Sequence, residues 1–403
     1  MERIIVVGGG QAGASLVAKL RASGHQGPVT LICEESVPPY QRPPLSKAYL
    51  KGEMELERLF LRPESFYEEN GIDLRLNTTA KAIDREHKVL IADGASLPYD
   101  QLALVTGSVP RRLPGAIGGD LSGVHVVRTL KDIDEMAPAF VPGKRAVIVG
   151  GGYIGLEAAA VAAEKGLDVT LIEATDRILG RVACPETADF IRAMHQGHGV
   201  DIREGVGVEK LLGDEHVTAA RLADGTDLAA DIVIVGIGIT PSTSLAEDAG
   251  LTLDNGIAVD AMGRTSDPAI WAAGDCASFP WRGGRLRLES VQNAIDQSEA
   301  VAQNMLGAEA PYVPHPWFWS DQYDLKLQIA GLGGDATHVV VRPGERAGTQ
   351  SHWYYRDADL VAVDALNDPR AYMVGKRLLE AGQSPAPEQV SDPGVVLKSL
   401  LKV

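Results

Sequence analysis

The chain has 403 residues, of which 45% are apolar and 23% charged, and it contains 44 glycines. At about 150 residues per domain, this length predicts two or three domains, and the composition excludes a disordered, coiled-coil or collagen-like protein. The formal net charge of −16 argues against a broad electrostatic surface for nucleic acid or anionic lipid. We therefore expect neither nucleic acid nor a membrane as a partner.

The cysteines predict no disulfide framework. Cys33, Cys184 and Cys276 are odd in number and far apart, and none forms a C-x-x-C pair, so zinc ribbons and vicinal redox disulfides are disfavoured. No histidine spacing indicates a metal site. The N-terminus enters an apolar strand at once, and no segment approaches the roughly 20 apolar residues of a membrane span. We expect a cytoplasmic protein.

One sequence unit occurs twice. Residues Arg3 to Gly13 read RIIVVGGGQAG, and residues Arg145 to Gly155 read RAVIVGGGYIG. Each copy continues through a helical stretch into a second apolar strand that ends on an acid, Glu34 in the first copy and Glu173 in the second. This is the strand–turn–helix–strand–acid order of a dinucleotide-binding unit.

Each glycine of the unit has a mechanical reason. The first permits a tight turn out of the strand, the second lets the backbone approach a pyrophosphate, and the third lets the helix pack on the strand. The free N–H groups of that helix then face the phosphates. A single G-x-G-x-x-G is often only a turn, but two copies in this context predict two dinucleotide sites. The positions are Gly8, Gly10 and Gly13, and then Gly150, Gly152 and Gly155.

The acid of the second copy bears on cofactor choice. A carboxylate at Glu173 repels a 2′-phosphate, which favours NADH over NADPH. Arg177 and Arg181 lie just downstream, so NADPH stays open.

Further strands complete the α/β pattern. Leu102 to Pro110 reads as a parallel strand that returns to the first sheet, and Thr265 to Asp275 reads as another strand that closes on Gly-Asp. From about Asp321 the pattern alternates like antiparallel strands, and Asp368-Pro369 is a typical helix start. The fold class is therefore α/β, with two Rossmann-like domains and a C-terminal α+β domain. We predict a first nucleotide domain from 1–113 and 244–320, a second from 114–243, and the C-terminal domain from 321–403.

Three further motifs are specific to a family. They are Arg42-Pro-Pro-Leu-Ser-Lys47, Gly150-Gly-Gly-Tyr-Ile-Gly-Leu-Glu157 and Pro316-Trp-Phe-Trp-Ser-Asp-Gln322. With the glycine units and Trp271-Ala-Ala-Gly-Asp275, they resemble the oxygenase-coupled, putidaredoxin reductase-like ferredoxin reductases among the glutathione-reductase-type flavoproteins. The resemblance implies FAD in the first nucleotide domain and NADH in the second. It implies hydride transfer to FAD, and then single-electron transfer to a 2Fe-2S ferredoxin that serves a haem-thiolate monooxygenase or a ring-hydroxylating dioxygenase.

The resemblance also implies site residues. Glu34, or the adjacent Glu35, would hold the FAD ribose, Asp275 the ribityl or pyrophosphate portion, and Val291 would lie near the pyrimidine edge. Lys47 and Glu157 would act at the nicotinamide–flavin contact, and Trp319 at the flavin edge. The residues implied for FAD are Gly8, Gly10, Ala12, Gly13, Glu34, Glu35, Arg42, Lys47, Ala80, Arg128, Asp275, Val291 and Trp319. Those implied for NAD are Gly150, Gly152, Tyr153, Ile154, Gly155, Glu157, Glu173, Arg181 and Gly238.

The sequence leaves the electron acceptor and one alternative function open. The acceptor could be rubredoxin, a quinone or oxygen, or the chain could be an NADH-sensing flavoprotein. Ferredoxins of this class are acidic, and Arg282, Arg285 and Arg287 form the densest basic run, so we expect them to dock the partner. We expect a monomer or a weak homodimer.

Overall fold

The computed structural model describes residues 1–402 and divides the chain into two compact units. Each unit is assembled from three separate stretches of sequence. The first unit contains residues 1–42, 54–109 and 239–314, and the second contains residues 43–53, 110–238 and 315–403.

A parallel sheet organises the first unit. Its strand order is β19-β7-β1-β2-β3, and all four neighbouring pairs are parallel. The strands are Ile4–Val7 (β1), Val29–Ile32 (β2), Ile72–Arg75 (β3), Gln101–Leu104 (β7) and Ile270–Ala272 (β19). The prediction that the segment around 102 returns to the first sheet is confirmed, and the strand predicted around 270 also joins this sheet.

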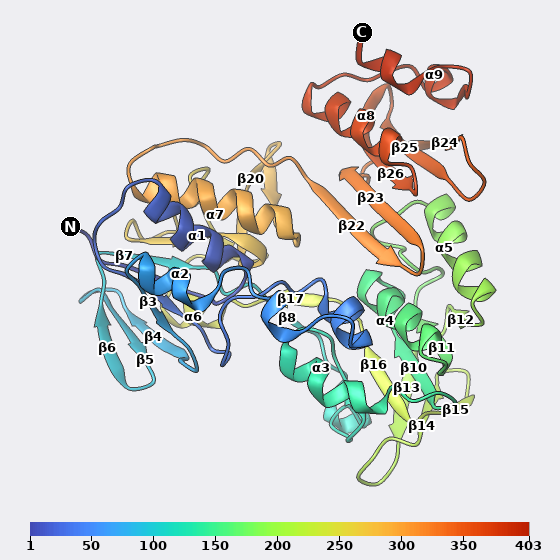
Figure 1. Ribbon diagram of the computed structural model, residues 1–403, viewed down its shortest axis with the longest axis horizontal. Coiled ribbons are helices and arrows are strands. Elements are labelled where there is room, and N and C mark those ends of the chain that lie inside the picture. Colours follow the sequence, from blue (N-terminus) through green and yellow to red (C-terminus); the bar gives the residue numbers. More distant parts are fainter. Residues whose placement is uncertain (403) are drawn as a thin grey trace. The chain divides into compact units, whose positions relative to one another are not determined.

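The central strands of this sheet are apolar on both faces, as parallel strands covered on both sides require. Ile4 and Val6 face one core, which α1 (Gln11–Ala22) and α7 (Val291–Met305) complete, and Figure 1 shows these two helices side by side. Ile5 and Val7 face a second core on the opposite side of the sheet. The smaller elements are η2 (Leu56–Arg58), α2 (Glu64–Glu69), β4 (Ala80–Asp84), β5 (Val89–Ala92), β6 (Ala95–Pro98), β8 (Ser108–Pro110), β17 (Ile239–Pro241), α6 (Ser244–Asp248), β18 (Ile257–Ala258), η5 (Gly274–Cys276), β20 (Ala277–Trp281) and β21 (Gly284–Leu286).

The second unit contains another parallel sheet, in the order β12-β11-β10-β16-β9. Its strands are Val124–His125 (β9), Arg145–Val149 (β10), Asp168–Glu173 (β11), Asp201–Glu204 (β12) and Ile232–Val235 (β16). The repeated sequence unit has thus folded twice in the same way, because β10 and β11 correspond to β1 and β2. The accompanying elements are η3 (Gly115–Ile117), α3 (Leu130–Met136), η4 (Ala137–Ala139), α4 (Tyr153–Glu164), α5 (Pro185–Gly197), β13 (Val208–Leu212), β14 (Ala219–Leu222) and β15 (Asp227–Ala229).

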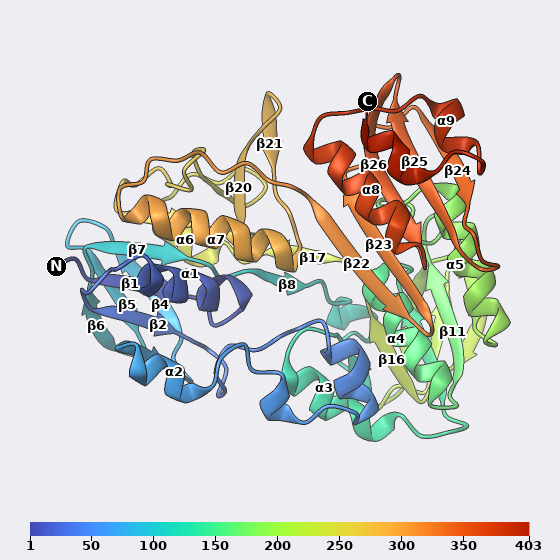
Figure 2. The ribbon, with the colours of Figure 1, turned by 45° about the horizontal axis from the view of Figure 1, so that its top comes forward.

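The C-terminal part of the second unit is an antiparallel sheet in the order β22-β23-β26-β25-β24. Figure 2 shows α8 lying along this sheet, and residues of α8 join its core. Asp368 caps α8 by accepting a hydrogen bond from the backbone N–H of Ala371 at 3.0 Å, as the sequence predicts. The elements are β22 (Trp317–Gln322), β23 (Leu325–Gly331), β24 (His338–Pro343), β25 (Gln350–Arg356), β26 (Asp359–Leu366), α8 (Pro369–Glu380), α9 (Pro387–Ser391) and η6 (Leu397–Lys402).

The observed units divide the chain at 109/110, 238/239 and 314/315, where the sequence predicts 113/114, 243/244 and 320/321, and residues 43–53 are a further difference. The boundary at 320/321 falls inside β22, which pairs along its whole length with β23 and so belongs to the C-terminal sheet. Residues 43–53 belong to the second unit although the chain on both sides of them belongs to the first. Within the second unit, the Tyr49 hydroxyl on this segment donates to Asp134, and Lys51 pairs with Glu164. Among residues 1–402, no helix is both long and apolar enough to cross a bilayer.

Candidate functional site

The first glycine turn connects β1 to α1 in the first unit. A Cβ at Gly8 would lie 2.2 Å from the carbonyl oxygen of Val105, and one at Gly13 would lie 2.0 Å from the carbonyl oxygen of Gly8. At Gly10, by contrast, no atom of residues 1–402 beyond its chain neighbours lies within 4 Å of the same position. Steric packing therefore requires a residue without a Cβ at Gly8 and Gly13, but not at Gly10. The open space at Gly10 lies at the start of α1, which has no side-chain cap, and it fits the pyrophosphate of a dinucleotide.

A second turn lies against the first. Gly274 has a φ of +78°, and a Cβ there would lie 3.2 Å from the Cβ of Ala12 in α1. Asp275 follows, and its Oδ2 accepts a hydrogen bond of 2.7 Å from the Ser108 hydroxyl. Both turns occur where parallel strands end, which is where ligands bind in such sheets. Asp275 is thus held beside the glycine turn, as the prediction of an FAD contact needs.

The acids after β2 differ in their contacts. Glu35 accepts a hydrogen bond of 2.8 Å from Arg42 and another from the Tyr40 hydroxyl. Glu34 is exposed. The Glu35 carboxylate is therefore already neutralised, and of the two alternatives for the ribose contact we favour Glu34.

The remaining residues predicted for FAD divide between the units. Ala80 begins β4, and Val291 is the first residue of α7, whose N-cap Ser290 accepts a hydrogen bond from Asn293. Three further residues, Lys47, Arg128 and Trp319, belong to the second unit. Trp319 lies on β22, with its ring centroid 5.5 Å from that of Trp317.

The basic run is exposed at Arg282 and Arg285, and two of its guanidinium groups also contact their own loops. The Arg285 guanidinium donates to the carbonyl oxygens of Val259 and Ser278. Arg287 donates to the carbonyl oxygen of Asp275 at 3.2 Å and pairs with Glu289 at 2.6 Å. Arg285 therefore stabilises its own loop through backbone carbonyl oxygens, and Arg287 stabilises the turn at Asp275.

The second glycine turn repeats the geometry of the first. A Cβ at Gly150 would lie 2.4 Å from the carbonyl oxygen of Gly236, and one at Gly155 would lie 2.1 Å from the carbonyl oxygen of Gly150. At Gly152 the nearest protein atom is 4.0 Å away. The middle glycine is again the one that packing does not require, so this turn also fits a dinucleotide pyrophosphate.

The residues after this turn have different environments. Ile154 is exposed, whereas the buried Tyr153 hydroxyl has no hydrogen-bond partner and its ring lies 4.9 Å from that of Phe318. Glu173 ends β11 and accepts hydrogen bonds of 2.8 Å from the N–H groups of Gly151 and Thr175. The predicted acid is thus fastened directly to the glycine turn.

Arg181 and Gly238 lie close to each other in the second unit. Gly238 follows β16 with a φ of +97°, and its Cβ position would lie 3.9 Å from Nη2 of Arg181. Arg181 is exposed.

Lys47 and Glu157, which the resemblance implies at the nicotinamide–flavin contact, form an ion pair. Glu157 is only 3% exposed, and its Oε2 lies 2.9 Å from Nζ of Lys47 and 2.8 Å from the Ser46 hydroxyl. Its Oε1 accepts a hydrogen bond of 2.8 Å from the Ser320 hydroxyl. A buried carboxylate needs such partners. The two serines were missed by sequence reasoning.

A separate buried cluster joins α5 to the C-terminal sheet. Among residues 1–402, Cys184, His352 and Asp364 bring potential metal-ligand atoms within 4.8 Å of one another. The Thr187 hydroxyl oxygen lies among them, 2.6 Å from Nδ1 of His352, 2.7 Å from Asp364 and 3.3 Å from the Cys184 sulfur. These groups therefore satisfy one another through Thr187. Cys184 is too far in sequence from His352 and Asp364 for a spacing motif to predict the cluster.

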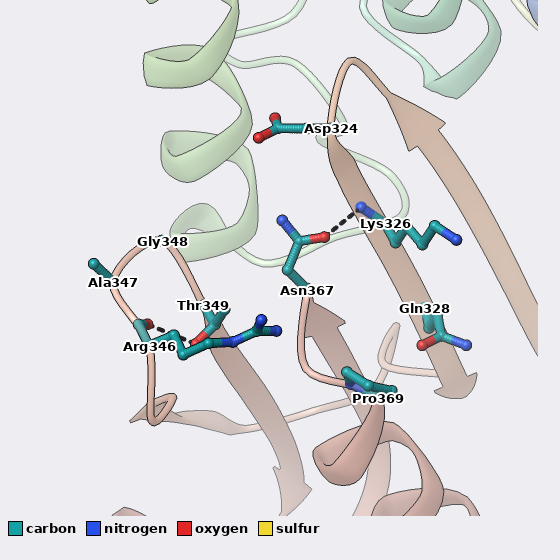
Figure 3. A pocket seen from close by; sticks show the side chains of 9 residues that line it. All are labelled: Asp324, Lys326, Gln328, Arg346, Ala347, Gly348, Thr349, Asn367 and Pro369. Atoms are coloured by element: carbon teal, nitrogen blue, oxygen red, sulfur yellow. Dashed lines mark hydrogen bonds between the residues drawn. The ribbon is translucent and has the colours of Figure 1, made fainter.

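A surface pocket of about 500 Å³ lies elsewhere in the C-terminal part (Figure 3). In it the Asn367 side-chain oxygen accepts a hydrogen bond of 2.8 Å from the backbone N–H of Lys326. None of the residues predicted for FAD or NAD lines this pocket.

Substitution of two glycines should separate ligand binding from folding. We expect Gly10→Ala to leave the thermal midpoint of the apoprotein unchanged, because its Cβ meets no atom, but to weaken FAD binding about tenfold or more, or about 1.4 kcal/mol per factor of ten. Gly13→Ala should instead lower the thermal midpoint, because its Cβ meets a carbonyl. Titration of apoprotein with FAD and thermal unfolding measure both. Unchanged FAD affinity in Gly10→Ala would contradict the assignment of the space.

Buried histidines should make stability depend on pH. Burial lowers the pKa of both His195 and His352 to about 4, so between about 6.5 and 4 the unfolded chain binds protons that the folded chain does not. Stability should therefore fall with acidification, by on the order of 3 kcal/mol per histidine. Asp364 acts in the opposite sense, because burial raises its pKa to about 6. His352→Gln should show a shallower fall of thermal midpoint with pH, and an unchanged slope would refute this origin.

Comparison with known proteins agrees with this arrangement. Residues 2–298 match the family described as pyridine nucleotide-disulphide oxidoreductase, and residues 317–401 match the domain described as reductase C-terminal. The ferredoxin reductase subunit of 5,5′-dehydrodivanillate O-demethylase from Sphingobium sp. is 44% identical over 402 residues, which cover 98% of this chain and 97% of that protein. A rubredoxin-NAD(+) reductase from Pseudomonas putida is 38% identical, over 91% of this chain and 96% of that protein.

A solved structure extends the likeness to the fold. The reductase of the covalent putidaredoxin reductase–putidaredoxin complex superimposes with a TM-score of 0.96 at 38% identity, covering 100% of this chain and 98% of that one. Sequence and structure therefore agree over both glycine units and the C-terminal sheet. The chain belongs to the pyridine nucleotide-disulphide oxidoreductase family, among the ferredoxin reductases of putidaredoxin reductase type.

Proposed function

We propose that this protein is an NADH-dependent, FAD-containing ferredoxin reductase that supplies electrons to a 2Fe-2S ferredoxin of an oxygenase system. The observation that carries the proposal is that a protein with two open dinucleotide turns has no accessible thiol pair. Its three cysteines, Cys33, Cys184 and Cys276, are free and buried. Burial raises the pKa of each thiol, to about 12 for Cys33. Since the thiolate is the reactive form, electrons leave this protein for an external carrier rather than a disulfide.

The chain's own residues would position the cofactors. The turn at Gly10, Asp275 and the start of α7 at Val291 would hold FAD, and the turn at Gly152 with Glu173 would hold NADH. When bound, FAD supplies the conversion of a two-electron hydride donor into two single-electron transfers.

Lys47 and Glu157 have distinct tasks in this proposal. The Lys47 ammonium would stabilise the negative charge that develops on reduction. Glu157 holds Lys47 in place through Oε2. A carboxylate oxygen accepts about two hydrogen bonds, and Oε1 receives one, from Ser320. Oε1 therefore has capacity for one further donor, which we assign to the nicotinamide carboxamide.

A rubredoxin is the second candidate acceptor, because one relative of nearly equal coverage is named a rubredoxin-NAD(+) reductase. Ferredoxin remains the favoured acceptor, since a relative with 44% identity is named as a ferredoxin reductase subunit.

The three free, buried thiols suit a reducing compartment, and we place the protein in the cytoplasm.

A panel of acceptors tests the proposal. FAD-loaded protein and NADH are mixed with acidic 2Fe-2S ferredoxins, a rubredoxin, cytochrome c alone or oxygen, and turnover is followed by absorbance. We expect rapid cytochrome c reduction only when a 2Fe-2S ferredoxin is present. Turnover confined to rubredoxin would replace the acceptor, and flavin bleaching without transfer to any carrier would instead indicate an NADH sensor.

Glu173 provides a test of cofactor choice. We expect Glu173→Gln to raise the ratio of kcat/KM for NADPH to that for NADH about tenfold (about 1.4 kcal/mol), because it removes the charge that repels a 2′-phosphate. The amide oxygen can still accept the Gly151 N–H, so the turn is retained. Steady-state kinetics with both nucleotides measure the ratio. A wild-type enzyme that uses both nucleotides equally well would contradict the assignment.

A further inference from the structure

A line of hydrogen bonds leads from His195 on α5 to Glu157 on α4 within the second unit. The Ser320 hydroxyl lies 2.8 Å from Glu157 Oε1, and Nε2 of Gln322 lies 3.0 Å from the Ser320 oxygen. Oε1 of Gln322 lies 2.8 Å from Nε2 of His195, whose Nδ1 lies 3.4 Å from the Tyr323 hydroxyl. Ser320, Gln322 and His195 are each at most 1% exposed. The line thus connects α5 to α4 through β22, entirely out of water.

The protons of this line have one consistent arrangement. An ionised carboxylate only accepts, so Ser320 gives its single hydroxyl proton to Glu157 and must itself accept from the Gln322 amide. The amide oxygen of Gln322 then faces His195, which must carry its proton on Nε2. The neutral ring consequently accepts at Nδ1, where the Tyr323 hydroxyl can donate. Every donor in the line points toward Glu157.

The reverse arrangement is costly. If the Gln322 amide turned over, its oxygen would draw the Ser320 proton away from Glu157. Oε1 of a buried carboxylate would then lose the donor that the structure gives it, and such a loss is expensive in a water-free site. His195 resists this flip, because its Nε2–H requires the amide oxygen on its own side. The orientation of the Gln322 amide, which is two hydrogen bonds away from Glu157, therefore controls the contacts of the carboxylate.

We propose that Gln322 and His195 are positioning residues, which hold the Ser320 hydroxyl as a donor to Glu157 Oε1 and so fix the carboxylate that pairs with Lys47. This inference rests on the proposed function and deepens it. Oε2 is held by Lys47 and Ser46, and Oε1 by Ser320. Without Ser320 the carboxylate is free to turn about the Oε2 contacts, and the remaining acceptor site on Oε1 loses its direction.

Flavin reduction by NADH tests the proposal, because it needs no electron acceptor. In anaerobic rapid mixing of FAD-loaded protein with NADH, we expect Ser320→Ala to lower the limiting rate of flavin bleaching about tenfold (about 1.4 kcal/mol). Gln322→Met should lower it about threefold. The double variant should be no slower than Ser320→Ala, because Gln322 acts only through Ser320. Ser320→Thr keeps the hydroxyl and should restore most of the rate.

A matched control separates positioning from packing. Ser351 is a buried serine of the same sheet, and its hydroxyl accepts a hydrogen bond of 2.9 Å from the Trp353 indole instead. Ser351→Ala should leave the limiting rate unchanged. Rate losses that add in the double variant, or that follow the thermal midpoint across all variants, would overturn the proposal.

The protonation of His195 gives a readout independent of activity. Nitrogen-15 NMR distinguishes the two neutral imidazole tautomers, and we expect His195 to carry its proton on Nε2, with the fixed tautomer lost in Gln322→Met. A proton on Nδ1 would overturn the direction of the line. If NADH failed to reduce the flavin of the wild-type protein, the proposed function would be wrong, while the tautomer would still report on the line.

Discussion

A carboxylate that is 3% exposed needs several donors, and Glu157 obtains them from distant parts of the sequence. Lys47 and Ser46 come from η1 (Leu45–Tyr49), and Ser320 comes from β22. Residues 43–53, which supply two of these donors, belong to the second unit although the chain around them belongs to the first. Glu157 also ties the C-terminal sheet to the nucleotide-binding sheet of the same unit. One buried charge thus contacts all three separate stretches of the second unit.

The two glycine turns show how one residue type can serve two purposes. The outer glycines are required by the protein itself, since a Cβ at any of these four positions would meet a backbone carbonyl oxygen at 2.4 Å or less. The middle glycines meet no such obstacle, which leaves space at the start of α1 and of α4 for an external group. Both turns share this contrast although their helices differ in sequence. The duplicated geometry therefore supports two bound dinucleotides more directly than the motif alone.

Much of the fold could be predicted because its signals are local. The glycine spacing, the apolar runs of β7 and β19 and the capped start of α8 all read directly from short segments. The first strand of the C-terminal sheet did not, because Trp-Phe-Trp in β22 lacks the alternation that marks a strand. Ser46 and Ser320 lie inside two of the family motifs, but the sequence does not show their role, because that role arises only when Glu157 is buried beside them. Sequence also cannot show that the guanidinium groups of Arg285 and Arg287 donate to nearby carbonyl oxygens, so the docking of a partner at Arg282, Arg285 and Arg287 stays a prediction.

The exchange of residues 43–53 has a consequence for how the chain matures on the ribosome. Ser46 is made 111 residues before Glu157, and Ser320 is made 163 residues after it. The loop carrying η1 must therefore wait, unpaired, through the synthesis of the whole second glycine unit, and Glu157 lacks its Oε1 donor until β22 emerges. Contacts this far apart in sequence slow folding. Vectorial synthesis consequently delivers β1, β2, β3 and β7 of the first sheet long before the second unit can close around its buried charge, whereas β19 (Ile270–Ala272) follows only after the second glycine unit.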